Sequence, residues 1–72
     1  MALPNMVAVS SSNIREMGHQ GSSLWVRFAN GQLWCYRGVP KAKAIAMRSA
    51  GSVGSYFARE IKPHYQGTKV EG

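Results

Sequence analysis

The segment LWVRFANGQLWCYRGVP, residues 24–40, decides the fold class of this chain. Apolar and polar residues alternate on both sides of Asn30-Gly31, a pattern that predicts two half-buried strands joined by a tight turn. The segment also carries two tryptophans, a phenylalanine, a tyrosine and two arginines. Depending on how the strands pair, these aromatic side chains form either an exposed stacking surface or the core of a small sheet.

In the first possible register, Asn30-Gly31 forms a two-residue type I′ turn, so that Val26 faces Cys35. This register leaves a cluster of aromatic side chains exposed to water. One face would hold Leu24, Val26, Phe28, Leu33 and Cys35, and the other would gather Trp25, Arg27, Trp34 and Tyr36. This register predicts a base-stacking platform.

In the second register, the loop is Ala29-Asn30-Gly31 with Gly31 in a left-handed bulge position, and every later pairing slips by one residue. One face then holds Leu24, Val26, Phe28, Trp34 and Tyr36, and the other holds Trp25, Arg27, Leu33, Cys35 and Arg37. We favour this register because it places five large side chains on one face, where the predicted helices can cover them. Burial of each side chain contributes about 1.5–3 kcal/mol to stability. This register makes Trp25 the only outward-facing tryptophan of the hairpin.

The residues after the hairpin predict two short helices. Pro40 suits the first turn of a helix, and residues 41–50 are rich in helix formers, with Ile45 and the alanines available to pack. Gly51 is a natural helix end, and Ser52 can cap a second helix that runs through Ile61. The predicted fold class is therefore α+β, with a small antiparallel sheet of about three strands covered on one face by two short C-terminal helices.

Both ends of the chain lack a strong pattern. A chain of 72 residues can build one small core and therefore one domain. A weak strand signal at residues 13–17 supplies the third strand of the predicted sheet. We predict a flexible N-terminal tail at residues 1–10, a single folded domain at 11–65 and a flexible C-terminal tail at 66–72.

Charge is the strongest compositional signal. Nine Lys and Arg residues against three acidic residues give a net charge of +6, which predicts an anionic partner. Net charge alone does not separate a nucleic acid, an acidic protein surface and a membrane surface. No apolar run approaches the roughly 20 residues that span a bilayer, so we expect a cytoplasmic protein that makes no membrane contact.

Residues able to carry out catalysis are few and scattered. Cys35 is the single cysteine, the two histidines at positions 19 and 64 are far apart, and no two of the three glutamates are close in sequence. Catalytic pairs and metal sites need such groups at short, defined spacings. We therefore predict no enzyme activity, no metal site and no cofactor.

The basic residues on and around the hairpin and first helix are the candidates for partner binding. Trp and Arg are frequent at binding hot spots, although a solvated helix face or a covering N-terminal segment would also explain these residues. The predicted partner-binding surface consists of Arg15, Trp25, Arg27, Arg37, Lys41, Lys43 and Arg48.

Four segments resemble the KTSC domain, a module of about 60 residues found at the C-terminus of some lysyl-tRNA synthetases and alone in bacteria and phages. They are SSNI, the hairpin, AMRSAGSVGSYF and EIKPHY, and the resemblance covers roughly residues 9–65. The chain departs from the family at Trp34, where tyrosine is usual. The resemblance implies a domain without established catalytic activity, for which RNA binding has been suggested.

Length, charge and the whole-chain pattern are also similar to the type of small RNA-polymerase-binding transcription regulator found in a Xanthomonas bacteriophage. This similarity implies a monomeric protein of the host bacterial cytoplasm that binds the large subunits of RNA polymerase. Its expected action is to block sigma-dependent initiation, by sigma factor displacement, and to promote antitermination, with weak nucleic-acid contact. The alternative is a basic module that binds RNA or DNA directly.

Overall fold

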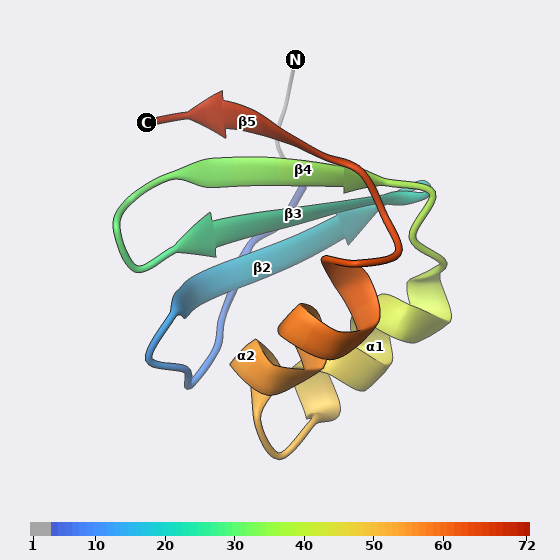
Figure 1. The fold of residues 1–72 in the computed structure, drawn as a ribbon, viewed down its shortest axis with the longest axis horizontal. Helices are drawn as coiled ribbons and strands as arrows, with labels where there is room; N and C mark the ends of the chain where they lie inside the picture. Colours follow the sequence, from blue (N-terminus) through green and yellow to red (C-terminus); the bar gives the residue numbers. More distant parts are fainter. Residues whose placement is uncertain (1–3) are drawn as a thin grey trace.

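The computed structural model describes residues 4–72, in which helices cover one face of a five-stranded antiparallel sheet (Figure 1). Neighbouring strands pair in the order β1-β2-β3-β4-β5. The last strand therefore returns beside β4 after the helices have crossed the sheet. The strands are β1 (Val7–Ala8), β2 (Ile14–Gln20), β3 (Ser23–Phe28), β4 (Leu33–Arg37) and β5 (Gly67–Glu71).

The central hairpin has the register with the three-residue loop. Val26 lies opposite Trp34. The Gly31 N–H donates to the Phe28 carbonyl at 2.9 Å, and the Phe28 N–H donates to the Gln32 carbonyl at 2.8 Å. Gly31 has a φ of +91°, a conformation that glycine adopts without a Cβ penalty. The prediction of the bulged register is confirmed.

Two helical segments cover the inner face of the sheet. Helix α1 (Lys41–Ser49) follows Pro40, and α2 (Val53–Tyr56) begins after Ser52, whose Oγ accepts a hydrogen bond from the Ser55 N–H at 3.3 Å. Helix α2 continues into a π-helical turn, η1 (Phe57–Ile61). The predicted second helix therefore has the expected extent, but its last turn is wider than an α-helical turn.

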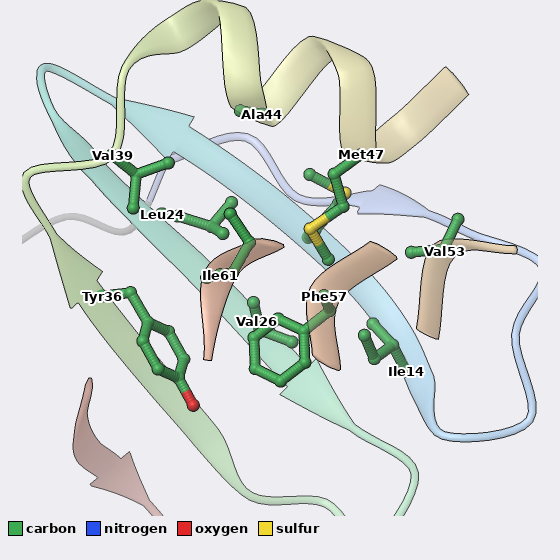
Figure 2. Close-up of a cluster of buried hydrophobic side chains, with 11 residues drawn as sticks. Ile14, Leu24, Val26, Tyr36, Val39, Ala44, Met47, Val53, Phe57 and Ile61 are labelled. Atoms are coloured by element: carbon green, nitrogen blue, oxygen red, sulfur yellow. The ribbon is translucent and has the colours of Figure 1, made fainter. Parts of the chain in front are cut away.

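The core lies between the inner face of the sheet and these helices, as Figure 2 shows. Phe57 meets Phe28 and Tyr36 edge to face, with ring centroids 5.4 and 5.2 Å apart. Eleven buried side chains form the cluster: Ile14, Met17, Leu24, Val26, Tyr36, Val39, Ala44, Met47, Val53, Phe57 and Ile61. The predicted α+β class and the helical cover on one face are confirmed.

The outer face of the sheet carries a second, smaller cluster. It consists of Trp25, Leu33 and Cys35, and Met6 packs against it. A Cβ at Gly18 would lie 2.8 Å from the Met6 Sδ and 2.9 Å from the carbonyl oxygen of Asn5. Residues 4–6 therefore lie directly on Gly18, the residue opposite Trp25 in the β2–β3 ladder, and cover part of this face.

The prediction of about three strands is wrong, because the two segments predicted as tails supply β1 and β5. Residues 1–3 of the predicted N-terminal tail lie outside the described residues. Both additional strands are edge strands whose residues are mostly exposed, so their local pattern is weak. Strand β2 also runs beyond the predicted 13–17 to Gln20 and ends before Gly21, which has a φ of +64°.

Candidate functional site

Ion pairs divide the basic side chains into two groups. Arg27 binds both Glu16 and Glu71, at 3.3 and 3.0 Å. Lys43 and Arg59 share Glu60, each at 3.2 Å. The remaining basic side chains are exposed and form no ion pair with residues 4–72: Arg15, Arg37, Lys41, Arg48, Lys62 and Lys69. These unpaired cations carry the net positive charge of the protein.

Two of the unpaired cations line one groove of about 320 Å³ between α1 and the β1–β2 side of the sheet. We call it the α1 groove. Its walls are Lys41, Ala44, Ile45 and Arg48 from α1, and Asn5, Val7, Met17, Gly18 and His19 from the strand side. Within residues 4–72 no carboxylate lines this groove, so the charge of its described walls is positive.

Along α1, the groove residues Lys41, Ile45 and Arg48 are spaced i, i+4 and i+7, which places them on one stripe of the helix. The helical rise of 1.5 Å per residue separates the two cations by about 10 Å along the axis. Ile45 lies between them and is 52% exposed, so this side chain, which the sequence leaves available to pack, lies outside the core. An exposed aliphatic side chain flanked by two unpaired cations is the central feature of this site.

His19 forms part of the groove wall and also ties the sheet to the start of α1. Its Nε2 lies 2.7 Å from the Val39 carbonyl oxygen. Because a carbonyl only accepts, Nε2 carries the hydrogen and donates it. No carboxylate orients the ring, so His19 acts here as a positioned wall residue rather than as part of an acid–base pair.

The structure separates the predicted partner-binding residues. Lys41 and Arg48 line one groove, and Trp25 and Arg37 line a second hollow on the other side of the sheet. Arg27 and Lys43 are held in ion pairs, and Arg15 is exposed on β2 and is not part of the α1 groove wall. Sequence reasoning missed His19 and Val7 as wall residues, because their position beside α1 depends on how the strands pack against the helix. The spacing of Lys41, Ile45 and Arg48 could have revealed the stripe.

Trp25 faces outward as predicted, and of the two alternatives for this residue the structure shows the covering N-terminal segment. The residue is 9% exposed, because Met6 packs against the outer-face cluster to which it belongs. Its Nε1 is buried and has no hydrogen-bond partner among the described residues. By contrast, the Trp34 Nε1 donates to the Gln32 Oε1 at 3.1 Å.

A second hollow, of about 450 Å³, lies on the outer face beside Trp25. We call it the outer-face hollow. Its walls are Ser22, Ser23, Trp25, Cys35, Arg37, Thr68 and Val70. Arg37, one of the predicted binding residues, therefore belongs to a different surface from Lys41 and Arg48.

Within residues 4–72, no three His, Cys, Asp or Glu side chains are grouped so that they could hold a metal ion. The helices of that same part of the chain are too short or too polar to cross a bilayer.

The family model of the KTSC domain matches residues 10–65 of this chain. Among solved structures, the crystal structure of a KTSC domain protein from Yersinia pestis is similar, with a TM-score of 0.86 and 29% sequence identity. The similarity covers 92% of this chain and 96% of that chain. No curated protein matches the sequence.

Proposed function

This chain belongs to the KTSC domain family, and we propose that it is a non-enzymatic module that binds an acidic protein surface in the α1 groove. The observation that carries this proposal is the exposed Ile45 between Lys41 and Arg48, neither of which has an ion-pair partner among residues 4–72. The two cations speed and orient the encounter with an acidic surface. Burial of the aliphatic centre then slows dissociation.

Bacterial RNA polymerase is the partner that we propose. The support is the similarity of length, charge and whole-chain pattern to the phage type of polymerase-binding regulator. In this proposal, the domain acts as a monomer in the bacterial cytoplasm and occupies a surface of the large subunits that sigma requires. It thereby blocks sigma-dependent initiation and promotes antitermination.

The kind of apolar surface favours a protein partner over a nucleic acid. Among the described residues, the exposed large hydrophobic side chains are the aliphatic Val7, Ile45 and Val70. Stacking of bases requires accessible aromatic faces, whereas Trp25 and Tyr36 are 9% and 6% exposed. The other aromatic side chains of the described residues are all at least partly buried: Phe28, Trp34, Tyr56, Phe57 and Tyr65. Direct RNA or DNA binding stays the alternative, supported by the unpaired cations.

The test measures, by interferometry, the affinity of two variants of this protein for immobilised bacterial RNA polymerase. Each variant carries two charge reversals. Lys41→Glu with Arg48→Glu alters the α1 groove, and Lys62→Glu with Lys69→Glu changes the net charge equally outside it. We expect the groove variant to weaken binding about tenfold or more and to relieve inhibition of sigma-dependent transcription in vitro. The control should change affinity less than about threefold. Equal losses in both variants would mean that net charge alone drives binding.

The nucleic-acid alternative is tested without polymerase, by fluorescence anisotropy on labelled duplex DNA and single-stranded RNA. If phosphates are bound, log affinity falls with log salt concentration by about 0.9 per neutralised phosphate on the duplex. A flat titration at low salt removes the alternative and leaves the protein-binding proposal standing. A steep salt dependence combined with no affinity for polymerase would replace the proposal.

A further inference from the structure

Trp25 holds the only buried side-chain polar atom among residues 4–72 that lacks a hydrogen-bond partner, its indole Nε1. A buried N–H without an acceptor destabilises the folded protein, because it has lost water and gained nothing. Such a group therefore indicates where an acceptor from outside the chain could bind. Trp25 also forms part of the wall of the outer-face hollow.

Strand register brings the walls of this hollow together on one face of the sheet. Trp25 lies opposite Cys35, and Cys35 lies opposite Thr68, across three neighbouring strands. One step along the same face, Ser23 lies opposite Arg37. The volume of about 450 Å³ is within the usual range for small-molecule sites, about 300–1,000 Å³.

The two ends of the hollow differ in chemistry. Arg37 and the serine hydroxyls gather at the end beside the β2–β3 turn, and none of their side chains forms a hydrogen bond or ion pair with residues 4–72. Val70, 46% exposed, lies toward the other end with Cys35. No carboxylate lines the hollow. One end is therefore rich in donors and cationic, and the other is apolar.

We propose that the outer-face hollow binds a small organic anion, with its charged head at Arg37 and its apolar body over Cys35 and Val70. A carboxylate or a phosphate head fits, because a guanidinium binds either in the same forked geometry. The indole N–H of Trp25 is buried in the free protein, so it gains an acceptor from the ligand only when the ring or the covering Met6 moves. This site lies on a different surface from the α1 groove and does not depend on polymerase binding.

The test is an NMR titration of the full chain that follows the indole N–H signals of Trp25 and Trp34. Phenyl phosphate and benzoate carry both an anionic head and an apolar body, while inorganic phosphate and benzyl alcohol each carry one of the two. We expect saturable shifts of the Trp25 indole and of the amides of Ser23, Arg37 and Thr68 with an aromatic anion. The single-feature compounds should bind about tenfold more weakly, and the Trp34 indole should stay in place.

A pair of variants identifies the charged contact. Arg37→Gln should weaken the aromatic anion about tenfold, and Lys62→Gln, which removes a charge far from the hollow, should leave its affinity unchanged. Equal effects of both variants would overturn the proposal. So would a Trp25 indole that no compound shifts and that shows only contact with water, because the hollow would then be merely hydrated.

Discussion

Gly67 of β5 lies opposite Tyr36 of β4, and the phenol ring of Tyr36 fills the space that a side chain at position 67 would need. Burial raises the pKa of the Tyr36 phenol above its ordinary value. The ring also meets Phe57 at a centroid distance of 5.2 Å. The contact with Gly67 therefore couples the C-terminal strand to the helical core, and the same register places Thr68 opposite Cys35 in the outer-face hollow.

Gly67→Ala is predicted to destabilise the protein by about 1–3 kcal/mol, because the new methyl group would overlap the Tyr36 ring. Urea denaturation measures the loss of stability. The rate of amide hydrogen exchange should increase most in β5. The matched control is Gly51→Ala, where an added Cβ meets nothing within 4 Å and should change stability by at most about 0.5 kcal/mol. If both variants are equally stable, the ring does not anchor β5.

Gly18→Ala is predicted to displace residues 4–6, because the added Cβ would press against the Asn5 carbonyl and the Met6 Sδ. Loss of this cover should expose the indole of Trp25. In a Trp34→Phe background, we expect a red-shifted emission and stronger acrylamide quenching. Met6→Ala in the same background should act in the same direction, since Met6 packs on the outer-face cluster. Unchanged emission in both would contradict the covering role of this segment.

Substitutions at Met47 and Ile45 of α1 are predicted to have different effects: one lowers stability and the other lowers affinity for the partner. Met47 is fully buried, so Met47→Ala should cost about 2–5 kcal/mol on chemical denaturation. Ile45 is 52% exposed, so Ile45→Ala should change stability by at most about 0.5 kcal/mol. The same Ile45 variant should dissociate faster from RNA polymerase. A large stability loss for Ile45→Ala would show that this side chain packs within the protein instead.

The Lys43–Glu60 pair predicts a pH dependence of stability. Hydrogen bonds from Lys43 and Arg59 lower the pKa of Glu60 below its ordinary 4.5, and the hydrogen bond to Glu60 raises the pKa of Lys43 above its ordinary 10.5. The Glu60 contribution is therefore present above pH 4.5 and disappears as the pH falls through the folded-state pKa. The Lys43 contribution is present below pH 10.5 and disappears as the pH rises through its folded-state pKa.

We expect the melting temperatures of the wild type and Glu60→Gln to differ by a constant amount between about pH 6 and 9 and to converge in acid. Scanning calorimetry across this range measures the difference. The double variant Lys43→Gln with Glu60→Gln should lose the acid-dependent part in the same way. A difference that persists unchanged at about pH 3 would exclude the carboxylate as its source.

For the candidate sites, sequence reasoning identified cations but not their grouping. Lys41 and Arg48 were correctly placed on one helix, yet their alignment with Val7 and His19 depends on strands that are distant in the chain. Arg27 was a candidate for partner binding, but the fold places Glu16 and Glu71 within ion-pair distance of it. Contacts between segments far apart in sequence decide which charges stay unpaired, and no local pattern encodes them.

Both helices follow from neighbouring residues, whereas the local pattern of the hairpin allows two registers and burial beneath the helices favours the bulged one. Local signals act within a few positions of the chain, so they can be recognised in the sequence. They are Gly31 at the bulge, the alternation of apolar side chains and the cap at Ser52. The edge strands and the covering of Trp25 follow instead from three-dimensional packing. Residues 7–8 and 67–71 form strands because β2 and β4 offer unpaired backbone groups there, a stabilisation that exists only once the centre of the sheet has folded.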